Sequence, residues 1–156
     1  FGWAKPVPFN PYNLKDSQWD PVWVALAGPF SNLAIAIISA VILRILSVTG
    51  GMAASSLLPV FLILLVIINL FLLFFNLLPV HPLDGSKLLD AILTKPEHQP
   101  LRHAIATYGP QVLMAMVIIS IITPFNIFFF VSAPSYAACD AMVGESCITL
   151  LALIFG

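Results

Sequence analysis

Residues 57–89 of this chain read "LLPVFLILLVIINLFLLFFNLLPVHPLDGSKLL". Up to Val80 the stretch is apolar except for Asn69 and Asn76, and about twenty apolar residues are enough to cross a bilayer as a helix. The stretch therefore predicts a membrane span. It then breaks into two prolines, a histidine and an Asp-Gly pair, so an ionisable Asp84 lies close to the end of a span.

The composition predicts a lipid environment for the whole chain. Of the 156 residues, 60% are hydrophobic and 8% are charged, whereas a soluble domain carries about a quarter charged residues. Such a chain cannot cover its surface with polar groups, so we expect the lipid bilayer around it. The net charge of −1 argues against a nucleic-acid partner, because phosphate binding needs clustered Lys and Arg.

Two further spans are predicted, one on each side of the first. Residues 21–43 carry no charge, and a third apolar stretch covers about residues 108–131. Residues 132–146 have the composition of a polar loop, and the last ten residues, "CITLLALIFG", are too short to cross a membrane alone. The sequence thus predicts an all-α membrane protein: one domain over residues 1–156, with about three transmembrane helices and a short partial C-terminal helix.

The basic residues predict which side of the membrane each loop occupies. Three spans place residues 1–20 and 81–107 on one side, which holds five basic residues: Lys5, Lys15, Lys87, Lys95 and Arg102. The other side has only Arg44 near its edge, so the first side is expected to be cytoplasmic in a multi-pass cell-membrane protein. Cys139 and Cys147 then fall towards the outside, where they could form a disulfide or remain two thiols.

The Asp84 segment allows two interpretations. Pro79 and Pro82 hinder a regular helix, and irregular backbone at membrane depth must face protein or a wet cavity. A carboxylate beside such a break is a candidate functional group that could bind a cation, relay a proton or pair with a base. Alternatively, Asp84 is the N-cap of a helix that begins at Gly85. Asp90 is expected to be solvated, and the three histidines to lie at the protein surface or at the membrane interface.

Polar groups also occur inside the first two spans. In "LAGPFSN", residues 26–32, Pro29 opens a kink, Gly28 permits close helix approach, and Asn32 needs a hydrogen-bond partner in lipid. Asn32 could pack against a neighbouring helix or bind a substrate backbone. Asn69 and Asn76 are two helical turns apart, so they share a face that leads towards Asp84.

The N-terminal segment "FGWAKPVPFNPYNL", residues 1–14, is too rich in proline to be helical. It predicts an extended segment within residues 1–20 at the membrane surface, with Trp3 and Tyr12 as interfacial anchors. An exposed edge of this kind could accept a strand from another peptide, or it could be a simple interfacial linker.

Taken in order, "FGWAKPVPFNPYNL", "AGPFSN" and "NLFLLFFNLLPVHPLDGSKLL" resemble the site-2 protease family of intramembrane zinc metalloproteases. The resemblance covers about residues 1–93. It implies that Asp84 is the third zinc ligand, and that Asn32 positions the substrate or the oxyanion. It also implies that the surface segment receives an extended stretch of a membrane-protein or peptide substrate through Lys5, Pro6, Val7, Pro8, Phe9 and Asn10.

One departure from the family pattern is large. The family's other two zinc ligands and its general base lie on an HExxH helix upstream of the "GWAKPVP" segment, and this sequence contains no HExxH. Catalytic zinc needs three protein ligands and an open position. We therefore expect the chain to be the C-terminal part of such a protease, with one zinc ligand, and to be inactive alone. Ser86 stands where the family usually has a second glycine.

Two other classes remain open at this point. The chain could be a non-catalytic membrane scaffold that has lost the metal centre. It could also be a small transport module, with its path lined by Asn32, Asn69, Asn76 and Asp84.

Overall fold

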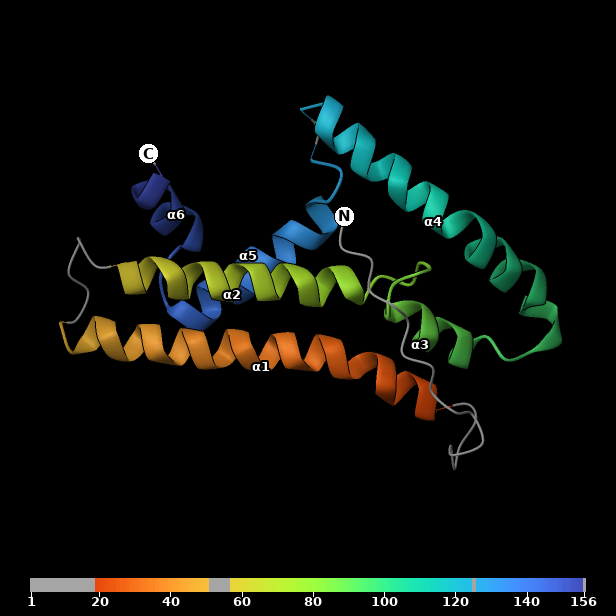
Figure 1. Ribbon diagram of the computed structural model, residues 1–156, viewed down its shortest axis with the longest axis horizontal. Coiled ribbons are helices and arrows are strands. Elements are labelled where there is room, and N and C mark those ends of the chain that lie inside the picture. Colours follow the sequence, from red (N-terminus) through yellow and green to blue (C-terminus); the bar gives the residue numbers. More distant parts are fainter. Residues whose placement is uncertain (1–18, 51–56, 125, 156) are drawn as a thin grey trace.

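The computed structural model describes residues 19–50, 57–124 and 126–155, and the regular secondary structure of these residues is helical (Figure 1). In chain order the helices are α1 (Asp20–Val48), α2 (Leu57–Asn76), α3 (Gly85–Ile92), the short 3-10 helix η2 (Pro96–His98), α4 (Gln99–Ile122), α5 (Phe129–Val143) and α6 (Cys147–Phe155). No strand occurs among these described residues. The extended segment predicted near the N-terminus, including Lys5 to Asn10, lies outside them.

The predicted all-α membrane fold is confirmed. Three helical stretches are long and apolar enough to cross a membrane: α1, α2 and residues 96–122. The third stretch differs from its predicted bounds, because it begins with η2 and ends at Ile122. Pro124 accounts for this end, since a proline disfavours the helical conformation of the residue before it and Thr123 is extended.

Helix α5 corrects the prediction of a polar loop over residues 132–146. Two of its serines bond to groups close by in the chain: the Ser135 hydroxyl donates to the Val131 carbonyl oxygen at 2.7 Å, and the Ser132 hydroxyl accepts from the side-chain amide of Asn126, just before the helix, at 3.1 Å. Composition alone indicates a loop here because it does not register such local hydrogen bonds. The helix ends at Gly144, whose φ of 87° is readily adopted only by glycine.

The core lies where α1, α2 and α5 meet. Helices α1 and α2 lie side by side along most of their length, and α5 crosses them (Figure 1). Ala36 and Ala40, one turn apart on α1, are completely or almost completely buried, and small residues at this spacing let two helices approach closely. The buried residues of this core are Ala36, Ala40, Leu43, Leu62, Ile63, Val66, Ile67, Leu70, Leu73, Cys139 and Cys147.

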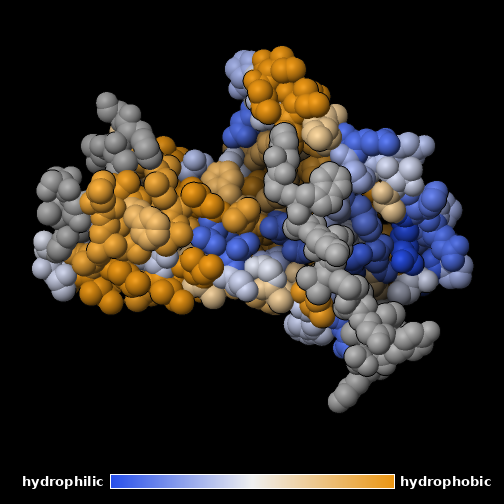
Figure 2. All heavy atoms as spheres, in the orientation of Figure 1, coloured by the Kyte–Doolittle hydropathy of each residue, from blue (hydrophilic) through white to orange (hydrophobic). Residues whose placement is uncertain are grey.

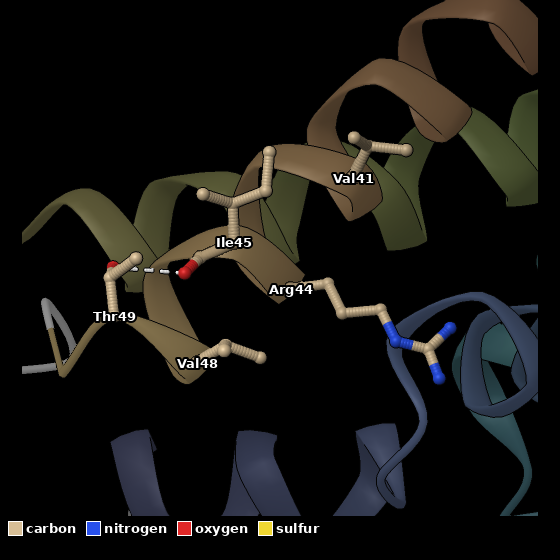
Figure 3. Close-up of a pocket in the computed structure, with 5 residues that line it drawn as sticks. All are labelled: Val41, Arg44, Ile45, Val48 and Thr49. Atoms are coloured by element: carbon tan, nitrogen blue, oxygen red, sulfur yellow. Dashed lines mark hydrogen bonds between the residues drawn. The ribbon is translucent and has the colours of Figure 1, made fainter.

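At the end of the bundle away from α3, a disulfide and an arginine hold the segment that joins α5 to α6. Cys139 and Cys147 are paired, with their Cα atoms 6.2 Å apart, so the open question about these cysteines is answered in favour of a disulfide. The Cys147 amide also donates to the Asp140 carboxylate at 2.7 Å. From α1, the Arg44 guanidinium extends towards the segment that joins α5 to α6, where it lies against Gly144 (Figure 3). A cation here is favourable because the carbonyls at a helix C-terminus carry partial negative charge.

The surface divides into an apolar and a polar part. Figure 2 shows hydrophobic side chains covering the end of the bundle where α1 ends and α2 begins, and hydrophilic side chains gathered towards the α3 end. Large apolar side chains are widely exposed, for example Val48 at 84% and Ile121 at 78%. Helix α4 diverges from the bundle, and among its residues only Gly109 is buried. Such surfaces are suited to lipid rather than to water.

Candidate metal centre

The candidate site is built on residues 77–84, which we call the proline loop. Helix α2 ends at Asn76, and the chain then makes irregular turns, with the Val80 amide bonded to the Leu78 carbonyl at 2.8 Å and the Leu83 amide to the Val80 carbonyl at 2.9 Å. The two prolines donate no backbone hydrogen bond, and the His81–Pro82 peptide is cis. The predicted break of the helix before Gly85 is thus present.

Three glycines let neighbouring helices contact the proline loop closely. A Cβ at Gly85, the first residue of α3, would collide with the carbonyl groups of Leu77 and Leu78. A Cβ at Gly109 of α4 would lie 3.1 Å from the His81 carbonyl oxygen, and one at Gly28 of α1 would lie 3.3 Å from an Asp84 carboxylate oxygen. The loop is therefore enclosed by α1, α3 and α4 at distances that leave little room for a side chain.

Asp84 occupies the N-cap position of α3 without acting as a cap. Its φ and ψ are helical, −61° and −35°, and its side chain makes no capping hydrogen bond. The half-buried carboxylate instead faces Gly28 on α1. Burial raises the pKa of Asp84 above its ordinary value, and the nearby positive charge of Lys87 opposes that change. Capping therefore does not explain why this carboxylate is held here.

Asn32 lies near the same contact. It follows Gly28 by four residues, one helical turn, so both residues belong to one face of α1, and its side chain is half-buried. By contrast, Asn69 and Asn76 each donate their amide to a carbonyl of their own helix, at Leu65 and Leu72, at 2.8 and 2.9 Å. The roles assigned to Asp84 and Asn32 remain predictions.

A group that the sequence did not reveal lies beside the loop. Asp90, expected to be solvated, is 3.4 Å from the His81 imidazole and accepts a hydrogen bond from Arg102 at 3.3 Å. The His81 side chain is 21% exposed. These residues come from the proline loop, α3 and α4, and no periodicity in the sequence relates them. Only the unusual density of charges between residues 81 and 103 could have drawn attention to them.

Two buried polar atoms beside Asp84 have no hydrogen-bond partner within the described part of the chain. They are Nδ1 of His81 and the hydroxyl oxygen of Ser86. Buried polar groups are normally paired, so these two atoms are available for a further hydrogen bond.

The donor set fits zinc in part. A carboxylate oxygen is an accepted zinc ligand, and Asp84 is not engaged in capping. However, the residues that the structure describes bring together no group of three or more His, Cys, Asp or Glu able to hold a metal ion. Asp84 can thus supply one ligand of a zinc site, and the described residues do not complete it.

The fold and the proline loop together define a class of protein. It is a helical membrane protein in which the break between two helices presents a carboxylate to a Gly-Pro segment of another helix. The sequence profile of peptidase family M50 matches residues 43–120, which is half of the chain, and the chain belongs to this family, that of the site-2 proteases. The match includes the proline loop, α3 and most of α4.

A relative in Bacillus subtilis (strain 168) carries the name "Putative zinc metalloprotease YwhC". It is 38% identical to this chain over 96 residues, which are 60% of this chain and 44% of the relative. The chain thus spans less than half the length of the relative that it matches. No solved structure matches the chain.

Proposed function

We propose that this chain forms part of an intramembrane zinc metalloendopeptidase that cleaves membrane-protein substrates, with Asp84 as one zinc ligand. The observation that carries the proposal is the Asp84 carboxylate, which occupies an N-cap position, makes no capping bond and faces α1 across Gly28. Membership of peptidase family M50 and the similarity to a protein named as a zinc metalloprotease support it.

Each part of the proposed site has a separate role. Asp84 holds the metal together with two ligands from an HExxH helix outside this chain, which in the family also carries the general base. Zinc, when bound, supplies a Lewis acid that lowers the pKa of a water ligand and polarises a carbonyl group. Asn32 offers a donor and an acceptor to the substrate backbone.

Binding of the substrate is assigned to the N-terminal segment. A helical substrate hides its amide groups in its own hydrogen bonds, so it must unwind before cleavage. The segment from Lys5 to Asn10 would hold it extended through backbone hydrogen bonds, as an added strand.

The test compares Asp84→Ala with the wild type in the full-length protein. We expect the variant to lose stoichiometric zinc, measured by elemental analysis, and to lose cleavage of a model membrane substrate. Its free energy of unfolding in the metal-free form should change little, because the carboxylate makes no capping hydrogen bond, whereas loss of a true N-cap costs about 1 kcal/mol.

Glu97→Gln is the matched control, because it removes an exposed carboxylate from the same segment. If zinc content and cleavage both survive in Asp84→Ala, Asp84 is not a ligand. The isolated 156-residue chain should hold no stoichiometric zinc, and finding it there would contradict the proposed origin of the other two ligands.

A further inference from the structure

Asp90 connects the proline loop to α4. It lies in the last turn of α3, and its two carboxylate oxygens face different partners. One oxygen is 3.4 Å from Nε2 of His81, a residue of the loop, and the other accepts a hydrogen bond from Nε of Arg102 in α4 at 3.3 Å. The Asp90 side chain is 26% exposed, so solvent screens these contacts only in part.

Backbone hydrogen bonds within the proline loop form its turns, for example from the Leu83 amide to the Val80 carbonyl at 2.9 Å, and contacts from α3 and α4 add to them. The loop lacks the regular hydrogen bonds of a helix. The close contacts at Gly28, Gly85 and Gly109 limit where the loop can move, but they are not polar interactions that would orient its side chains. Within the described residues, the contact between His81 and Asp90 joins the loop to a charged side chain of α3, and His81 precedes Asp84 by only three residues. The contact of His81 with Asp90 thus lies close in the chain to the Asp84 carboxylate.

We infer that Asp90 is a positioning residue for the metal centre: by contacting His81 with one carboxylate oxygen and Arg102 with the other, it links the proline loop to α4 and so helps to direct Asp84 at the metal. This inference rests on the proposed function of Asp84. Groups that orient a metal ligand from outside typically change metal affinity by tenfold or more when they are removed.

Two other roles for the group formed by His81, Asp90 and Arg102 have less support. His81, Asp90 and His103 line one polar pocket, but the described residues contain no group of three ligands with metal-binding geometry. The cluster also differs from an ordinary surface ion pair. Lys95 and Glu97 are 3.7 Å apart with side chains 73% and 66% exposed, and pairs of that kind contribute little.

The experiment uses the full-length protein with Co²⁺ in place of zinc, because cobalt reports its ligands through its visible absorption. Asp90→Asn should weaken metal affinity about tenfold and change the cobalt spectrum. Asp90→Glu keeps the charge and should restore most of the affinity. Glu97→Gln, which removes the exposed carboxylate, should behave as the wild type.

Three outcomes decide the matter. If Asp90→Asn matches Glu97→Gln in affinity and spectrum, the inference is wrong. It is also wrong if the loss of affinity simply follows a loss of thermal stability and Asp90→Glu does not reverse it. If Asp84→Asn leaves metal binding intact, the proposed function itself fails, which separates the two failures.

A second variant keeps the inference testable if Asp90→Asn does not fold. Arg102→Gln removes the partner in α4 but leaves the contact between His81 and Asp90. It should lower metal affinity in the same direction by a smaller factor. An unchanged affinity in this variant would overturn the role of the connection to α4.

Discussion

At the scale of single residues, Gly85 controls how α3 begins. Its Cα lies so close to the end of α2 that a Cβ would collide with the carbonyl groups of Leu77 and Leu78. Backbone groups cannot rotate away as a flexible side chain can. The Asp-Gly pair therefore combines the carboxylate proposed as a zinc ligand with a residue whose lack of a side chain permits this path of the backbone.

Gly85→Ala should destabilise the protein by about 1–3 kcal/mol, because α3 must shift to relieve the overlap. The shift should also lower metal affinity, since Asp84 adjoins Gly85. Unfolding in detergent and metal titration measure the two effects.

Gly50→Ala provides a contrast. A Cβ there meets nothing within 4 Å, and only the φ of 73° opposes the substitution, at about 1 kcal/mol. It should leave metal affinity unchanged. Equal effects of the two alanines on metal affinity would show that the contact at Gly85 does not matter.

The sequence identified Asp84 as a residue of interest but not its surroundings. The prolines and the Asp-Gly pair reveal a break, because their effects are local to the backbone. The contacts of Asp84 with Gly28 and of His81 with Asp90 join separate elements, and their geometry depends on how helices pack. For the same reason the sequence left the choice between cap and functional group open, whereas the structure shows a side chain that does not cap.

At the scale of elements, hydropathy located the long helices but not all of their ends. Helix α4 starts within a polar stretch, where Pro100 lies in its first turn and favours helix initiation. A prediction based on apolar residues therefore places the start of this helix too far along the chain. Helix α5 was missed because serines and an aspartate suggest a loop. In the structure those groups bond locally, and the Cys139–Cys147 disulfide ties the helix to α6.

Replacing Cys139 and Cys147 together by alanine should lower the free energy of unfolding by about 2–3 kcal/mol, because the disulfide closes a loop of sequence separation 8 and so restricts the unfolded chain. Denaturant unfolding in detergent measures the difference. A reductant should bring the wild type to the level of the double variant and leave the variant unchanged. A wild type that reductant does not affect, under conditions that expose both sulfurs, would contradict the role of the bond.

At the scale of the whole molecule, the basic residues predict the orientation in the membrane. Among the residues that the structure describes, Lys87 and Lys95 lie in α3 and just after it, while Arg44 lies towards the opposite end of α1, beside the turn that joins α5 to α6. We therefore expect the α3 end to face the cytoplasm.

Glu97→Cys and Glu145→Cys test this orientation in intact cells. Both positions are exposed, and the two native cysteines are paired and do not compete for the reagent. A membrane-impermeant thiol reagent should label the cysteine at position 145 and should reach position 97 only after the cells are opened. The reverse pattern would show that the molecule is inserted the other way round.

The contact of Gly109 with the proline loop has a consequence for biosynthesis. The ribosome makes Gly109 twenty-five residues after Asp84, so α1, α2 and Asp84 are already at the membrane before α4 can close over His81. The nascent protein should therefore become able to retain a metal late in its synthesis. A variant of the full-length protein that ends after residue 98 should insert into the membrane yet bind the metal more weakly than the intact protein. Equal retention by both would mean that the loop takes its shape without α4.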